Sequence, residues 1–123
     1  MDNFYVSEKY VLIFDEVWKE QWKNLDNATK QRISKIFSRL ETDPHHVGNP
    51  LHYTGGKLRE VRMDHYRLYF AIVENTVEVL KLVVILELGH KDEQTKLIYR
   101  LTNQLSSKIN LALEKLRLRR SDS

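Results

Sequence analysis

Residues 57–73, KLREVRMDHYRLYFAIV, constrain the fold of this chain more than any other stretch. Two short runs rich in apolar and aromatic residues flank Asp64 and His65, a pattern that predicts two antiparallel strands joined by a tight turn. With these two residues at the centre of the turn, Arg62 lies opposite Arg67 on the neighbouring strand. Two arginines in direct opposition repel one another unless an anionic group lies between them. The hairpin is therefore the first candidate for an anion-binding site.

The same register assigns the side chains of the hairpin to two faces, because successive side chains of a strand point to opposite sides. One face would carry the polar and amphipathic residues Glu60, Arg62, Arg67 and Tyr69. The other face would be apolar and would pack in the core through Val61, Met63, Tyr66, Leu68 and Phe70. We therefore expect the arginine pair on a face of the sheet that the core leaves uncovered.

Length and composition limit the classes of protein to consider. The 123 residues suit a single domain, residues 1–123, with one core. A formal net charge of +3 is compatible with a nucleic-acid partner but does not require one. The absence of cysteine excludes disulfides and thiolate chemistry. The first ten residues lack the features of a signal peptide and no apolar run is long enough to span a membrane, so we expect a cytoplasmic protein without membrane association.

The N-terminal third predicts a strand followed by a helical hairpin. The apolar run YVLIF reads as a short strand, and Asp15 after it is a good helix N-cap. The first helix would cover about residues 16–25. A second helix, capped by Asp26 or Asn27 and ending near residue 42, carries apolar residues at helical spacing.

The remainder of the chain predicts a loop, three strands and a long helix. Residues 43–56 hold both prolines and three of the four glycines and must form a loop. After the hairpin, a turn at Glu74 and Asn75 leads to residues 77–88, whose nearly continuous apolar run is typical of a central strand. Leucines recur at helical spacing over residues 92–118. The predicted order is β-α-α-β-β-β-α, an α+β fold in which a small antiparallel sheet packs on a helical hairpin and a long C-terminal helix follows.

These features resemble the RelE/ParE toxin superfamily of type II toxin–antitoxin modules over roughly residues 10–98. The resemblance rests on the strand and helical hairpin ending in RLETDP, the Gly/Pro loop, the run LREVRMDHYRLYFAI and the run VEVLKLVVILELGHKD. The third feature is similar to a family pattern L-R-x-x-R-x-x-x-Y-R-L-x-Y. Its matching residues are Leu58, Arg59, Arg62, Tyr66, Arg67 and Leu68. The resemblance implies a RelE-like fold with a C-terminal helical extension at about 92–118.

The resemblance also implies a toxin that a cognate antitoxin neutralises. RelE-like members cleave mRNA, often on the ribosome, and need no metal or cofactor. A base takes the proton of the ribose 2′-OH, which attacks the adjacent phosphate, while arginines stabilise the developing charge and an acid protonates the leaving oxygen. ParE-like members share the fold and poison DNA gyrase instead. The first hypothesis is therefore an endoribonuclease, and the alternative is a gyrase inhibitor or a catalytically degenerate protein-binding member.

The family's functional residues transfer only in part. The catalytic candidates are Arg62, Arg67, Glu60, His90 and Tyr99. The substrate-binding candidates are Lys57, Arg59, Tyr69 and Lys91. Where related enzymes carry lysines on the first strand of the hairpin, this chain has Leu58 and Glu60, and a tyrosine further along becomes Leu97. These departures keep the non-catalytic alternative open.

Each of these features also has a plainer explanation. The two arginines would serve equally as surface ion-pair partners of Glu60 and Asp64. Trp18 and Trp22 are spaced for packing in the core. The loop histidines, His45, His46 and His52, lack the cysteine partners and helical spacing of a metal site, so no metal is expected. The leucine stripe of the last helix fits internal packing, a homodimer or the binding of an antitoxin helix.

Overall fold

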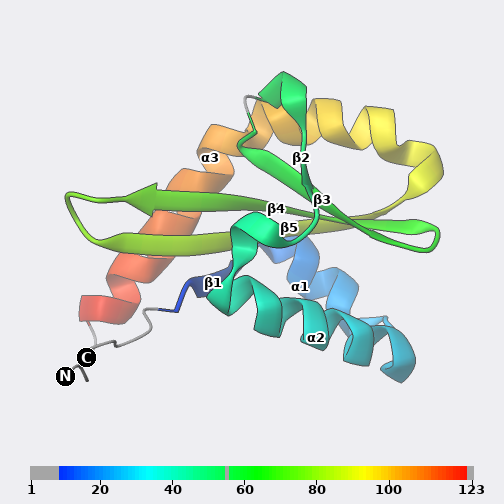
Figure 1. Cartoon of the computed structure of the whole chain (residues 1–123), viewed down its shortest axis with the longest axis horizontal. Coiled ribbons are helices and arrows are strands. Elements are labelled where there is room, and N and C mark those ends of the chain that lie inside the picture. Colours follow the sequence, from blue (N-terminus) through cyan, green and yellow to red (C-terminus); the bar gives the residue numbers. More distant parts are fainter. Residues whose placement is uncertain (1–8, 55, 122–123) are drawn as a thin grey trace.

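The computed structural model describes residues 9–54 and 56–121 (Figure 1). Within them, five strands form one sheet in the order β1-β5-β4-β3-β2. The strands are β1 (Val11–Phe14), β2 (Asn49–Pro50), β3 (Leu58–Met63), β4 (Tyr66–Asn75) and β5 (Leu80–His90). The α-helices are α1 (Glu16–Lys23), α2 (Asn27–Thr42) and α3 (Gln94–Ser121). The α+β class and the predicted order of elements are confirmed, with the short strand β2 added inside the Gly/Pro loop.

Strand direction differs between the two sides of the sheet. The strands β2, β3, β4 and β5 pair antiparallel, as predicted, whereas β1 runs parallel to β5. Parallel pairing needs a long crossover between the two strands. The helical hairpin, the loop and the β3–β4 hairpin together provide that length.

The helical hairpin forms where the sequence predicts it, because both N-caps are made. The Asp15 carboxylate accepts a hydrogen bond of 3.0 Å from the backbone nitrogen of Val17, and the Asp26 carboxylate accepts one of 2.8 Å from that of Thr29. Each bond satisfies a backbone N–H that has no partner within its helix. The helix α1 ends at Lys23, two residues before the predicted end.

The hairpin α1–α2 covers one face of the sheet with an apolar core. Its buried members from the sheet include Met63, Leu68 and Phe70, which confirms their predicted positions. Trp18, Ile33 and Leu40 from the two helices complete the cluster. Tyr66 was predicted to belong to this core and does not, because 46% of it is exposed. It lies at the turn end of β4, where its ring packs edge-on against a histidine ring and not against the helices.

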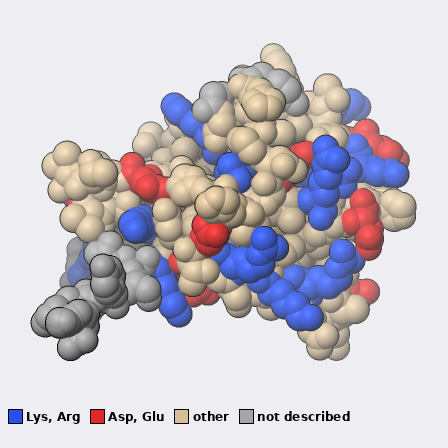
Figure 2. Space-filling view, in the orientation of Figure 1, with Lys and Arg blue, Asp and Glu red and all other residues tan. Residues whose placement is uncertain are grey.

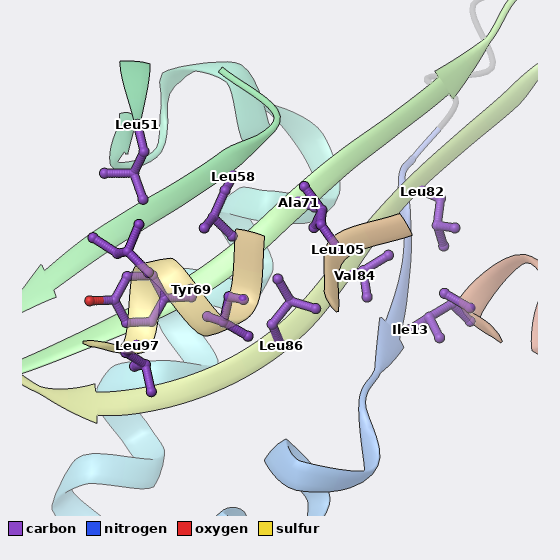
Figure 3. Packing of buried hydrophobic residues seen from close by; sticks show 13 residues of the cluster. Ile13, Leu51, Leu58, Tyr69, Ala71, Leu82, Val84, Leu86, Leu97 and Leu105 are labelled. Atoms are coloured by element: carbon purple, nitrogen blue, oxygen red, sulfur yellow. The ribbon is translucent and has the colours of Figure 1, made fainter. Parts of the chain in front are cut away.

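The helix α3 covers the opposite face of the sheet, which the sequence had predicted to be uncovered (Figures 1 and 3). Tyr69 is fully buried there and packs in one cluster with Leu97 and Leu105 of α3. Gly89 permits the close approach, since a Cβ at this position would lie 2.3 Å from the Cδ2 of Leu97. Although α3 is 28 residues long, none of the helices in the described part of the chain is both long and apolar enough to cross a membrane.

A bulge between β4 and β5 decides which side chains of β5 face α3. Tyr69 pairs with Glu87, but the next residue, Phe70, pairs with Ile85. Leu86 is therefore the extra residue of β5, and it packs in the same cluster as Tyr69. Because a bulge shifts the alternation of a strand by one residue, Glu87 also lies on the α3 side.

Candidate functional site

The turn of the β3–β4 hairpin has the predicted geometry. Asp64 adopts a left-handed backbone conformation with φ 54°, which aspartate tolerates in tight turns. The pairing of β3 with β4 places Arg62 directly opposite Arg67, as predicted from the turn. The opposed arginine pair is therefore confirmed as a feature of the sheet.

The two guanidinium groups are nevertheless held in different directions. The Nη1 of Arg67 donates hydrogen bonds of 3.1 and 3.0 Å to the carbonyl oxygens of Asp64 and Tyr66, at the turn. The Nε of Arg62 lies 3.6 Å from a carboxylate oxygen of Glu60, further back along β3, while 66% of the Arg62 side chain stays exposed. The pair does not converge on one anion position, and a carboxylate of the chain already lies beside Arg62.

The candidate base Glu60 is part of the attachment of α3. It is 2% exposed, and its Oε2 accepts a hydrogen bond of 2.8 Å from the side-chain nitrogen of Gln94, the first residue of α3. Tyr69, which pairs with Glu60 across the hairpin, is buried under the same helix. The structure therefore corrects the expectation that these two side chains lie on an open face.

The acid candidates lie away from the arginine pair. His90 pairs with Tyr66, while Arg67 pairs with Gly89, so the alternation of side chains puts His90 and Arg67 on opposite faces of the sheet. The Nδ1 of His90 accepts a hydrogen bond of 3.1 Å from the backbone nitrogen of Asp92. Tyr99 is 73% exposed. It stands two residues after the buried Leu97 on α3 and hence on the side of the helix that faces away from the sheet.

Arg59 is buried and bonded to the backbone of the protein, so its guanidinium group is not available to a substrate. One of its guanidinium nitrogens donates to the carbonyl oxygens of His45 and Val47, at 2.9 and 3.1 Å, and so fixes the loop before β3. Burial lowers the pKa of this guanidinium from its usual value. The loop fits because Gly48, at φ +67°, leaves room for the carbonyl group of Glu60, which a Cβ would approach to 2.2 Å. Arg59 was a substrate-binding candidate in the sequence. In the structure it stabilises the loop before β3, a role that the sequence reasoning missed.

The positive surface near the turn comes from β3, α2 and the segment after β5. Lys91 is exposed beside the turn, where its backbone nitrogen donates to the carbonyl oxygen of His65 at 2.7 Å. Lys57 is also exposed but precedes β3, at the other end of the strand; both lysines stay candidates for contact with an anion. Arg32 on α2 bonds the Asp64 carboxylate at 2.7 Å and keeps the pKa of that carboxyl below its usual value. Figure 2 shows lysine and arginine side chains over α2 and the hairpin, with acidic side chains among them. In the described residues, no group of three His, Asp or Glu side chains is placed to hold a metal ion.

The structure is similar to solved toxins of toxin–antitoxin systems. The RelBE2 toxin–antitoxin complex of Mycobacterium tuberculosis matches with 25% identity and a TM-score of 0.53, over 67% of this chain and 91% of that chain. The isolated RelE toxin of E. coli matches with 18% identity and a TM-score of 0.56, over 75% and 98%. A RelE variant of E. coli bound to a peptide of its antitoxin RelB matches with 18% identity and a TM-score of 0.53, over 71% and 92%. These likenesses confirm the RelE-like fold.

The sequence gives the family directly. No curated protein matches the chain. The profile of the family described as "ParE toxin of type II toxin-antitoxin system, parDE" matches residues 9–95. That span contains the helical hairpin, the Gly/Pro loop, the sheet and the start of α3. The chain therefore belongs to the RelE/ParE family as a toxin of a type II toxin–antitoxin system.

Proposed function

We propose that this toxin acts by binding a protein target, DNA gyrase as for ParE-like members, and not by cleaving RNA. The observation that carries the proposal is the burial of Glu60 and Tyr69 under α3. A general base has to come within hydrogen-bond distance of the proton that it takes. The carboxylate of Glu60 is closed off from solvent, and the side chain of Gln94 occupies one of its oxygens.

The arrangement of the charged groups also supports a non-catalytic toxin. Cleavage of a phosphodiester needs donors that converge on the developing negative charge. Here Arg67 bonds the carbonyl groups of its own turn and Arg62 lies beside Glu60. The acid candidate His90 lies on the other face of the sheet. RNA cleavage by this chain would therefore require α3 and the hairpin to rearrange together.

A specific observation keeps RelE-like mRNA cleavage as the second candidate. The direct opposition of Arg62 and Arg67, with the Arg62 side chain mostly exposed, leaves a local excess of positive charge at the end of the hairpin. Lys91, which follows β5 beside the turn, would add to it on binding of mRNA, with or without the ribosome, whereas Lys57 lies at the other end of β3. A bound phosphate would compete with Glu60 for the guanidinium of Arg62.

A cognate antitoxin is the expected partner in either case. Two of the similar structures described above are toxins in complex with an antitoxin or an antitoxin peptide. A homodimer through the C-terminal helix stays a prediction. Leu111 and Leu118, seven residues apart on α3, are both more than half exposed and would lie at such an interface.

Induced expression in a bacterial host separates the two candidates. We expect growth arrest with signs of DNA damage and intact messenger RNA, and we expect the purified protein to inhibit supercoiling by gyrase. Arg67→Ala should leave the arrest unchanged, as should the matched control Arg39→Ala on the exposed side of α2. Cleaved messengers that disappear with Arg67→Ala, but not with Arg39→Ala, would show that the second candidate is correct and our proposal wrong.

A further inference from the structure

The short segment that joins the sheet to α3 is capped by the side chain of a histidine. His90 ends β5, and the single-turn 3₁₀ helix η3 (Lys91–Glu93) follows it and leads directly into α3. A backbone N–H in the first turn of a helix has no acceptor within that helix. The Nδ1 of His90 accepts the hydrogen bond of the Asp92 backbone nitrogen, at 3.1 Å, so the imidazole ring is the N-cap of η3.

The Asp92 carboxylate lies close to the same ring nitrogen. Its Oδ2 is 3.3 Å from the Nδ1 of His90. A neutral imidazole with its proton on Nε2 accepts a hydrogen bond at Nδ1, whereas a protonated imidazole carries a proton on both nitrogens and only donates. The Nδ1 of His90 can therefore accept from the Asp92 backbone or donate to the Asp92 carboxylate, but it cannot do both. A single proton decides between the two bonds.

The β3–β4 turn packs against this junction, and Figure 1 shows the turn and the start of α3 at the same end of the sheet. The ring of His65 in the turn lies nearly parallel to the His90 ring, with 6.1 Å between the centroids, and the Tyr66 ring meets it edge-on at 5.8 Å. The other polar groups at this junction are Gln21 on α1, which is uncharged, Asp64 of the turn, and Lys91 and Asp92 of η3. The carboxylate that can compensate a charge on His90 is thus that of Asp92, since that of Asp64 is already paired with α2.

We propose that His90 is a pH-dependent cap at the junction between the sheet and α3. The neutral ring holds η3 through the Asp92 backbone. The protonated ring turns its Nδ1–H to the Asp92 carboxylate and leaves the Asp92 backbone N–H to solvent. The cap is therefore complete at alkaline pH and is lost as the pH falls, and histidine is the side chain that changes charge between pH 5 and 8.

A change at the cap reaches both neighbours of η3. The segment continues into Gln94, whose side chain bonds the buried Glu60 and so attaches α3 to the sheet. On the other side, the backbone nitrogen of Lys91 donates to the carbonyl oxygen of His65 at 2.7 Å, which ties η3 to the β3–β4 turn. Release of the cap should therefore loosen the first turn of α3 before the rest of the helix. The inference does not depend on which target the toxin poisons.

Hydrogen exchange of the Asp92 backbone amide in the full chain measures the state of the cap. His90→Asn is the informative variant, because the side-chain oxygen of asparagine accepts a hydrogen bond from a helix start and does not titrate. At pH 5 the Asp92 amide of the unaltered chain should exchange about fivefold faster than that of His90→Asn, since the unaltered chain has lost one hydrogen bond. At pH 8 the two proteins should exchange alike. Comparison at equal pH removes the pH dependence of exchange itself.

Two further variants complete the experiment. His90→Asp also keeps an acceptor throughout this pH range and should behave as His90→Asn does. His46→Asn is the matched control, because His46 likewise pairs with a carboxylate, that of Asp43 at 2.7 Å, but lies in the loop after α2. This control should keep the pH response of the unaltered chain.

Three results would overturn the inference. One is an Asp92 amide that exchanges no faster at pH 5 in the unaltered chain than in His90→Asn and His90→Asp. Another is loss of the pH response in His46→Asn, which would assign the response to the wrong histidine. The third is an equal acceleration at the amide of Leu101, a buried residue in the middle of α3, because acid would then loosen the whole helix and not the cap.

Discussion

The two faces of the sheet are both covered by helices, but they are built from different chemistry. The face under α1–α2 is apolar where the helical hairpin covers it, with Met63, Leu68 and Phe70 buried there, and its buried charge, Arg59, bonds the loop before β3 and no helix. The face under α3 adds two buried carboxylates, Glu60 and Glu87, to its apolar cluster. Alternation of polar and apolar residues along a strand therefore identifies which side a residue takes. It does not identify whether that side is exposed.

The second face also shows why candidate catalytic residues have to be judged by their partners. Gln94 on α3 bonds Glu60, and Arg100 on α3 bonds both oxygens of Glu87 at 3.0 and 2.6 Å. These carboxylates bind the helix to the sheet. A residue that holds α3 in place cannot serve as a base for a substrate unless the helix moves away.

The largest expected effect tests whether both faces belong to one cooperative core. Ile33→Ala on α2 and Leu101→Ala on α3 each remove a fully buried side chain, one for each face. Each should lower the free energy of unfolding by about 2–5 kcal/mol, measured by denaturant titration. If Leu101→Ala costs less than about 1 kcal/mol while Ile33→Ala costs its full amount, α3 is only loosely attached and the comparison fails.

The buried carboxylates of the α3 face give the next effect. Arg100→Ala leaves Glu87 without its bidentate partner and should cost about 2 kcal/mol, since hydrogen bonds to charged groups contribute about that much. Adding Glu87→Gln to Arg100→Ala should recover part of the loss, because no unpaired charge is then buried. A double-mutant cycle of unfolding free energies measures the coupling. Additive costs would mean that the pair does not interact.

The α1–α2 face should respond to alkaline pH through Tyr10. Burial and a hydrogen bond to Glu74 raise the pKa of Tyr10 from 10.0 to about 12. The folded state thus holds this proton more tightly than the unfolded state. The corresponding stability is complete below pH 10 and is lost as the pH rises from 10 to about 12, by about 1 kcal/mol per pH unit. Unfolding free energies of the unaltered chain and of Tyr10→Phe should converge over that range; parallel curves would contradict the shift.

The smallest effect is expected where neither face is involved. Arg32 and Asp64 join α2 to the hairpin turn, but both side chains are more than half exposed. Arg32→Ala should therefore cost less than about 1 kcal/mol at low salt. Thermal unfolding at low and high salt measures it, and the difference between variant and unaltered chain should shrink with salt. A loss of several kcal/mol would place this ion pair among the determinants of the fold.

Local signals accounted for the elements of the fold. The turn at Asp64 and His65 fixed the pairing of β3 with β4 residue by residue. The acceptors Asp15 and Asp26 set the starts of both early helices. The last strand was predicted at 77–88 and instead spans Leu80–His90. The chain between Asn75 and Leu80 forms the turn, and Val79, with a positive φ of 50°, still belongs to it. The strand therefore begins after the start of the apolar run.

By itself, the sequence determined the order of the main helices and strands, the hairpin register and the family, because turns, caps and periodicity act between residues close together in the chain. Only the tertiary structure decided that α3 lies on the second face of the sheet, that β1 runs parallel to β5 and that a bulge turns Glu87 toward Arg100. These outcomes depend on contacts between distant segments, such as Gln94 with Glu60. No local pattern specifies them, since the same alternating strand can face water or a helix.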